Sequence, residues 1–375
     1  MNFRKILCKL NLNIINWCFV TSIVIPSYVY TYIKIEFLQK LIIEEENLSV
    51  LKKFDNIKEF IDFISPYYPG IKISEYSIVE IEQALFHTLI KLIGKILYFS
   101  PENMKLFLKA YLLKYEIANI KQIILGSIIG ISKSEKSDRI NYLVEEYLER
   151  SDFIKNLLEI TDLEEIQLYM KNTRYNKPIR EGINYFKNTN EIFVLEAFLD
   201  KLYYENLLST KPFYDKKERA MISLFIDYST EVYNLRMLSR AIINNFDKNL
   251  TSQLLIQNYL FLNQQKVSYL LEINDIDEYI SELKKFLSST KELKELYIPI
   301  NINKRHLRWS FEAIYQNYYF KKFQLKIDDF EYFTIYRILE LIIKKEKEIK
   351  FNIMLNVIRI IHEKYEGLKD KNENL

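Results

Sequence analysis

The sequence predicts an all-α fold assembled from three copies of one helical unit, and three observations lead to this prediction. Only 6 Gly and 7 Pro occur among 375 residues, too few turn formers for an all-β or α/β chain of this length. Long stretches with helical apolar periodicity run between these few breakers. A short motif also recurs at matched spacing, which sets the architecture of repeat proteins.

The recurring motif is Glu-x-x-Asn followed by an aliphatic and a basic residue. It occurs as Glu116-Ile117-Ala118-Asn119-Ile120-Lys121 and as Glu231-Val232-Tyr233-Asn234-Leu235-Arg236. A weaker third copy contains Glu348, with Phe351 in place of the Asn and Asn352 one position late. Upstream of each motif, another Glu opens an apolar run. These upstream residues stand at positions 82, 196 and 312, and the motif Glu residues stand at 116, 231 and 348. These offsets of 34, 35 and 36 residues predict three related units.

In the first unit, 27–130, apolar stripes predict helices over 27–51, 53–68 and 78–99. The second of these stops at Pro66, Pro69 and Gly70. Ser100-Pro101-Glu102 supplies an N-cap and a Pro at the first helical position. A helix over 103–125 follows, carries the first motif, and ends at Gly126–Gly130.

In the second unit, 131–248, a polar link over 132–139 precedes short helices over 139–149, 153–160 and 163–172. Longer helices follow over 191–208 and 216–245, with a break at Pro212, and the second of them carries the second motif. The third unit, 249–368, is predicted to hold helices over 249–262, 275–287, 291–296, 309–323 and 332–364. A charged tail, 369–375, ends the chain.

The motif residues are expected to hold each helical hairpin together. Glu and Asn three positions apart share one helix face, and an Asn inside a helix needs a partner because its side chain competes for backbone groups. For Glu116, Asn119, Glu231 and Asn234 we favour this internal role over direct contact with a partner protein. Lys121 and Arg236 lie on another face, which leaves a neighbouring helix, another subunit or solvent as their contact. Solvent is favoured more for Lys121, because Arg240 extends a basic stripe from Arg236.

The composition argues against several classes of function. A balance of 53 basic and 50 acidic residues gives no reason to expect nucleic acid. Gly126 and Gly130 lack the Lys-Ser/Thr of a phosphate loop, and the 3 His residues lie far apart without Cys nearby. The acidic pairs Glu145-Glu146 and Asp328-Asp329 fit a solvated helix face and a helix cap. The sequence therefore predicts no catalytic residue, cofactor, metal or small-molecule substrate.

The N-terminus, 1–26, is an extension of a different kind. No residue from Asn11 to Ile33 is charged, and Arg4, Lys5 and Lys9 precede this stretch, as in a signal peptide or a short membrane span. Asn, Thr, Ser and Pro residues dilute its apolar character. We favour an apolar helix that breaks near Pro26, continues over 28–41 and packs on the body. Cys8 and Cys18 cannot crosslink the body, and two cysteines fit a reducing cytoplasm.

These motifs resemble the C subunit of the archaeal and bacterial V/A-type ATPases, called the d subunit in eukaryotes. Residues 231–241, which read Glu-x-x-Asn-Leu-Arg and end in Leu-Ser-Arg-Ala, are similar to that family's Asp-x-x-Asn-Leu…Leu-Arg-Ala signature. Residues 108–121 look like its first helical signature, and Leu199-Asp200-Lys201-x-Tyr203-Tyr204 resembles its Leu-Asp-Lys-x-Tyr-Tyr element. The chain departs from the family at Phe351, at Phe86 and in its N-terminal extension.

The resemblance implies a funnel of three helical units with pseudo-threefold symmetry, on the cytoplasmic face of a membrane. Its expected partners are the membrane proteolipid ring and the central-stalk subunits, and its role is that of a rotor part without chemistry of its own. The alternatives are a free-standing helical scaffold anchored by the N-terminal segment and, more distantly, a hydrolase. The motif positions, with a structural or partner-contact role, are Glu116, Asn119, Lys121, Asp200, Tyr203, Glu231, Asn234, Arg236, Arg240 and Glu348.

Overall fold

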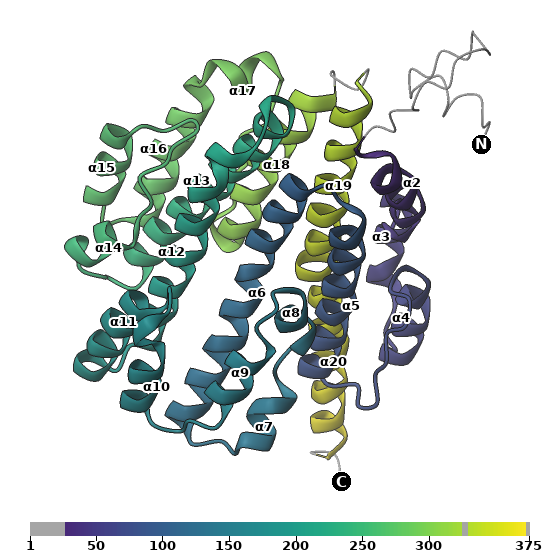
Figure 1. Cartoon of the computed structure of the whole chain (residues 1–375), viewed down its shortest axis with the longest axis vertical. Helices are drawn as coiled ribbons and strands as arrows, with labels where there is room; N and C mark the ends of the chain where they lie inside the picture. Colours follow the sequence, from purple (N-terminus) through teal and green to yellow (C-terminus); the bar gives the residue numbers. More distant parts are fainter. Residues whose placement is uncertain (1–26, 325–328, 373–375) are drawn as a thin grey trace, which may run out of the picture. The chain divides into compact units, whose positions relative to one another are not determined.

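The computed structural model describes residues 27–324 and 329–372, and every regular element in these ranges is a helix (Figure 1). The prediction of an all-α fold is therefore confirmed. The described residues form two compact units. The first comprises the residues up to Leu108, Asn141–Tyr147 and the residues after 328, and the second comprises Lys109–Ile140 and the residues from Leu148 to 324. The division into three units, and their funnel arrangement, remain predictions.

The first unit joins the beginning of the described chain to its end. Its elements are α2 (Val29–Leu38), η1 (Gln39–Leu41), α3 (Glu45–Val50), η2 (Leu51–Lys53), α4 (Ile57–Ile64), η3 (Ser65–Tyr67), α5 (Ile78–Phe99), the start of α6 (Glu102–Ile129), α8 (Tyr142–Tyr147), α19 (Phe330–Lys347), the π-helix η7 (Glu348–Ile353) and α20 (Met354–Asn372). Helix α2 packs against α5 and α19, and α5 packs against α8 and α20. Buried side chains at helical spacing, such as Ile81, Leu85 and Leu89 of α5, form this core.

The second unit is built around α13 (Lys216–Ile243), which packs against α12, α14, α16 and α18. Its other elements are the rest of α6, α7 (Lys133–Asp138), α9 (Ser151–Leu158), α10 (Leu163–Tyr169), η4 (Met170–Asn172), α11 (Asn176–Thr189), α12 (Ile192–Thr210), η5 (Lys211–Phe213), α14 (Lys248–Leu254), α15 (Gln264–Glu272), α16 (Ile276–Ser289), α17 (Lys291–Glu295), η6 (Lys304–His306) and α18 (Leu307–Gln324). Helices α11 and α12 pack closely because Gly182 leaves room: a Cβ there would lie 2.8 Å from the Leu195 Cα.

Long helices follow one another in pairs at the three places where the motif occurs. The pairs are α5 with α6, α12 with α13, and α18 with α19, and each of these helices has 18 residues or more. Caps define several starts: the side chains of Asn56, Ser77 and Asp329 accept hydrogen bonds from the first backbone N–H groups of α4, α5 and α19. The prediction that Asp329 caps the last long helix is confirmed.

Several predicted boundaries were wrong for local reasons. The helix expected over 27–51 is broken at Ile42, whose backbone is extended, and the polar link over 132–139 contains α7, which begins with a capping box formed by Ser132 and Glu135. The first motif helix continues to Ile129, and only Gly130, with φ +73°, ends it. Glu145 is buried, so the solvated face predicted for Glu145-Glu146 is wrong for that residue.

The helix expected over 249–262 ends at Leu254, and residues 255–263 form a loop. The prediction failed there because tertiary hydrogen bonds to this loop replace helical ones, as the next section describes. Helices α11 and α15 were not predicted. The N-terminal extension and its cysteines lie outside the described residues. No helix in the described ranges combines the length and the apolarity that crossing a bilayer requires.

Candidate functional site

The Glu of the first motif lies in the core of the second unit. Glu116 of α6 is completely buried, and Tyr175, at the start of α11, donates a hydrogen bond of 2.7 Å from its hydroxyl to Oε2. Arg150 compensates the charge, with Nη1 2.9 Å from Oε1. Burial raises the pKa of Glu116, and Arg150 and the Tyr175 hydrogen bond oppose that rise. The guanidinium also stacks on the Phe153 ring, which fixes its position.

The Glu of the second motif uses a different set of donors. Glu231 of α13 is completely buried and accepts hydrogen bonds from the backbone N–H groups of Leu260, Phe261 and Leu262 and from the Tyr315 hydroxyl. Every donor that the described residues supply to this carboxylate is uncharged. Burial raises the pKa of Glu231, while these hydrogen bonds oppose the rise. The carboxylate therefore holds the loop after α14 against α13 and α18.

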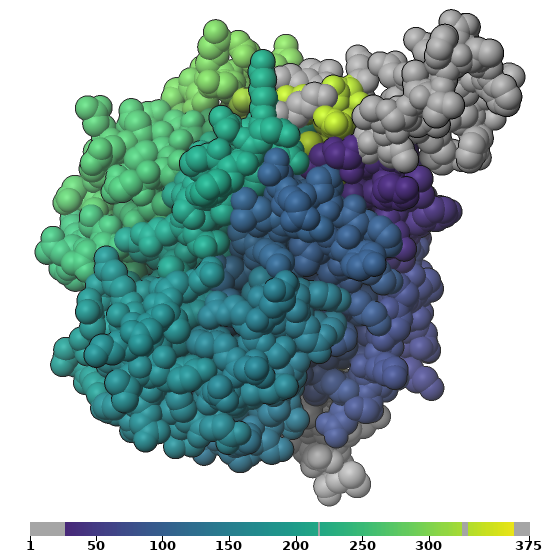
Figure 2. Space-filling model, viewed as in Figure 1, coloured from purple at the N-terminus to yellow at the C-terminus, as the bar shows by residue number. Residues whose placement is uncertain are grey.

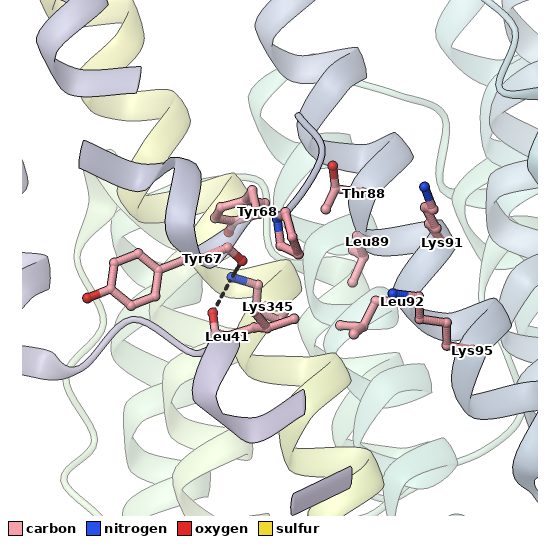
Figure 3. A pocket seen from close by; sticks show the side chains of 10 residues that line it. Leu41, Tyr67, Tyr68, Thr88, Leu89, Lys91, Leu92, Lys95 and Lys345 are labelled. Atoms are coloured by element: carbon pink, nitrogen blue, oxygen red, sulfur yellow. Dashed lines mark hydrogen bonds between the residues drawn. The ribbon is translucent and has the colours of Figure 1, made fainter. Parts of the chain in front are cut away.

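The Glu of the third motif ties the C-terminal helices to the N-terminal segment of the same unit. Glu348 is 3% exposed and accepts hydrogen bonds from the Tyr68 hydroxyl (3.2 Å), the Ile43 N–H (2.9 Å) and Lys345 Nζ (2.6 Å). Lys345 also donates to the carbonyl oxygens of Leu41 and Tyr67, as Figure 3 shows, and lies over the Tyr68 ring. Burial raises the pKa of Glu348, and Lys345 opposes this rise.

One arrangement is therefore common to the three motifs: a buried Glu accepts a hydrogen bond from a buried Tyr hydroxyl. We call the pairs Glu116–Tyr175, Glu231–Tyr315 and Glu348–Tyr68 the Glu–Tyr pairs. Burial raises the pKa of each tyrosine well above its usual value, so each stays protonated and remains a donor. The three pairs differ in the other group that contacts the carboxylate. It is Arg150 for Glu116, a row of backbone N–H groups for Glu231, and Lys345 for Glu348.

The Asn of the motif has a defined partner in the second copy. The Asn234 amide donates to the Ile256 carbonyl and accepts from the Ile256 N–H, both at 2.8 Å. Asn119 is buried in the first copy. In the third copy Asn352 is one position late, and the helix there is a π-helix over Glu348–Ile353. A π-turn accommodates one inserted residue within an α-helix, which explains the displaced Asn.

The basic residues of the motif contact acidic residues on the first helix of the next pair. Lys121 lies 2.7 Å from Asp200 of α12, and Arg236 lies 3.7 Å from Glu312 of α18. Their side chains are 16% and 22% exposed, so the solvated position favoured for Lys121 is wrong. A neighbouring helix is the contact in both cases. At the corresponding position of the third copy stands Ile353, which is completely buried.

The remaining predicted positions of the second unit lie close to these two ion pairs. Tyr203 is buried and packs against Tyr204, whose ring contacts that of Tyr233 in the second motif. Arg240 is exposed and its guanidinium lies over the Phe193 ring. Asp200 pairs with Lys121. The structure thus brings Lys121, Asp200, Tyr203, Arg236 and Arg240 near the contacts between successive helices, whereas Glu348 belongs to the other unit.

This arrangement is suited to holding helices together. The three carboxylates are buried and engaged by donors from distant segments. The pocket beside Lys345 in the first unit is small, and Leu89, Leu92, Tyr67 and Tyr68 line it (Figure 3). No group of three potential metal ligands occurs among the described residues.

Sequence reasoning missed the partners of the motif. Tyr175 lies 59 residues after Glu116, Tyr315 lies 84 after Glu231, and Tyr68 lies 280 before Glu348. No fixed spacing connects them, so a search for periodicity could not find them. Lys345 is an exception, because it lies one turn before Glu348 on a continuous helix.

The fold and the buried contacts of the described residues define an all-α protein whose helices are linked to distant segments by buried Glu–Tyr hydrogen bonds. The chain matches the model of the ATP synthase (C/AC39) subunit family over residues 34–371, and it belongs to that family. It is similar to the A-type ATP synthase C subunit of Methanocaldococcus jannaschii, with 25% identity over 95% of this chain and 87% of the relative. It is also similar to the protein of the same name from Thermococcus kodakarensis, with 21% identity over 88% of this chain and 86% of that one.

Proposed function

We propose that this chain is a non-catalytic rotor subunit of a V/A-type rotary ATPase, which couples the central stalk to the membrane proteolipid ring. The observation that carries the proposal is the family match across about nine-tenths of the chain. The relatives named as C subunits of A-type ATP synthases support it, because the similarity to two of them covers most of both chains.

The contacts of the motif support a mechanical role. A part that transmits torque must keep its helices in register under load. Buried, charge-assisted hydrogen bonds between distant segments meet that requirement, because they are directional and costly to break in a low-dielectric interior. Glu348, for example, connects the C-terminal helices to Ile43 and Tyr68 near the start of the chain. Force applied at either end of this unit would be passed on through such contacts.

The proposal places the chain at the cytoplasmic face of the membrane as a peripheral subunit. The partners are proposed to be the proteolipid ring and the central-stalk subunits, with no nucleic acid and no small-molecule substrate. Membrane association through the rest of the complex needs no spanning helix, and none occurs in the described ranges. The host machine would use this coupling either to make ATP or to pump ions.

Purification of the tagged, full-length chain from native membranes tests the proposal. Mild detergent should yield a complex that contains the proteolipid and the stalk subunits, identified by mass spectrometry. The control is the same purification after the complex has been dissociated with a chaotropic salt. A chain that is recovered alone from gently solubilised membranes would contradict the proposal and favour a free-standing scaffold.

A further inference from the structure

Helix α2 has apolar residues on both of its faces. Thr31, Tyr32, Ile35 and Leu38 are buried against the first unit. On the opposite face, Tyr30, Ile33 and Phe37 are 61%, 46% and 65% exposed. These three residues, at i, i+3 and i+7, form a continuous stripe along one side of a helix. The lowest-numbered residues of the described chain, in dark purple, lie at the surface in Figure 2.

The end of α5 lies beside α2 within the same unit. The Thr31 hydroxyl donates to the Phe99 carbonyl, and Lys34 Nζ lies 5.0 Å from the centre of the Phe99 ring. Tyr98, whose ring packs against that of Phe99, is 79% exposed. We call Tyr30, Ile33, Phe37, Tyr98 and Phe99 the α2 patch. Clustered exposed aromatic and aliphatic side chains mark an interaction surface, because a soluble surface rarely gathers them.

Two lysines lie at the α2 patch. Lys34 lies against Phe99, and Lys40 follows the helix as an exposed residue. Glu36, the acidic residue of α2, lies beside Arg337, 3.8 Å away, and is 23% exposed. It is also the first acidic residue of the chain, because positions 1–35 hold Arg4, Lys5, Lys9 and Lys34 but no Asp or Glu. Such a bias stands out in a chain with 53 basic and 50 acidic residues overall.

We propose that the α2 patch rests on the surface of a lipid bilayer that carries anionic headgroups. Tyr and Phe side chains suit the boundary between headgroups and acyl chains, and neighbouring lysines gain from the negative surface potential. The uncharged sequence from Asn11 to Ile33 leads directly into the patch, so apolar character continues along the chain. A second copy of the chain is the competing occupant, and the experiment below distinguishes it from a bilayer.

Flotation of the isolated full-length chain with vesicles tests this proposal. The vesicles are phosphatidylcholine with and without phosphatidylglycerol. The wild-type chain should float with the anionic vesicles and much less with the neutral ones. Ile33→Glu and Phe37→Glu should each lower binding about tenfold or more, because each removes an apolar contact and adds a charge that the anionic surface repels. Leu168→Glu is the matched control, at a position 69% exposed in the other unit, and should bind as the wild type does.

Three results would overturn the proposal. The first is failure of the wild-type chain to float with anionic vesicles. The second is undiminished flotation of both α2 variants, which would assign membrane binding to another part of the chain. The third is a wild-type dimer, detected by light scattering without lipid, that Phe37→Glu dissociates. Because the assay uses the isolated chain, none of these results bears on assembly with ATPase subunits.

Discussion

The Tyr315 hydroxyl of α18 donates a hydrogen bond to Glu231 of α13, and both side chains are completely buried. The same relationship links Tyr175 to Glu116 and Tyr68 to Glu348. The motif therefore uses its acidic residue to attach a helix to a segment that is distant in sequence. In the first and second copies its basic residue makes a second attachment, through Lys121 to Asp200 and through Arg236 to Glu312.

Removal of one tyrosine hydroxyl should destabilise the protein. Tyr315→Phe leaves the ring in place but takes a donor from the buried Glu231 carboxylate, and we expect a loss of about 2 kcal/mol in the free energy of unfolding. Urea denaturation followed by circular dichroism measures it. Tyr98→Phe, at a position that is 79% exposed, is the control and should change the unfolding free energy by no more than about 0.5 kcal/mol. Equal effects of the two substitutions would show that the Glu–Tyr pair does not stabilise the fold.

Substitution of the motif Asn should destabilise the protein more in the second copy than in the third. Asn234→Ala leaves the buried N–H and carbonyl of Ile256 without their side-chain partner, and we expect a cost of about 2–3 kcal/mol. Asn352→Ala is the matched control, because the bonded group of Asn352 is its backbone carbonyl, which the substitution retains. Thermal unfolding of the two variants gives the comparison. A larger loss of stability in Asn352→Ala would contradict the interpretation of the third copy as degraded.

The ion pair between Lys121 and Asp200 should contribute modestly to the free energy of unfolding. The two side chains are 16% and 41% exposed, so solvent screens part of their attraction, and a coupling of at most about 1 kcal/mol is expected. A double-mutant cycle with Lys121→Met and Asp200→Asn isolates this value. The coupling should weaken as salt is added. A coupling of zero at low salt would mean that the motif's basic residue does not hold α6 to α12.

The three buried carboxylates should make stability depend on pH in a defined direction. Burial raises the pKa of Glu116, Glu231 and Glu348 above the value of 4.5 expected in the unfolded chain. Between the unfolded and the folded pKa the folded state binds more protons, so these groups stabilise the fold increasingly as pH falls through that window. The Glu231→Gln variant lacks one such group. As the pH falls from 7 towards 4.5, the unfolding free energy of the wild type should therefore rise relative to that of the variant.

Glu135 supplies the control for this pH dependence. Hydrogen bonds from Ser132 lower the pKa of this exposed carboxyl, so it stays ionised in both states until the pH approaches 4.5. The stability difference between wild type and Glu135→Gln should therefore stay nearly constant from pH 7 downwards and shrink slightly as the pH reaches 4.5. A difference that shrinks on acidification for Glu231→Gln would show that its folded pKa lies below 4.5.

The fold class and the long helices could be predicted from the sequence because both depend on local patterns. Scarce glycine, helical apolar periodicity and the spacing of Glu116, Glu231 and Glu348 can be read along the chain. The internal role of Glu116, Glu231 and Asn234 was favoured because an Asn inside a helix needs a partner and the Glu shares its helix face. Their partners could not be predicted, since Tyr68 and Tyr315 reach the motif only through tertiary folding. The loop after Leu254 was missed for the same reason, because its backbone is held by Glu231 and Asn234.

A measurement of the coupling between ATP hydrolysis and ion movement tests the central proposal most directly. Membrane vesicles that contain the host ATPase should be compared with and without this chain, with both quantities measured in the same sample. Removal of the chain should leave hydrolysis in the catalytic head but abolish the ion gradient, and the purified chain should restore the gradient when it is added back. An ion gradient that is built at the normal ratio of ions to ATP in vesicles without the chain would contradict the account.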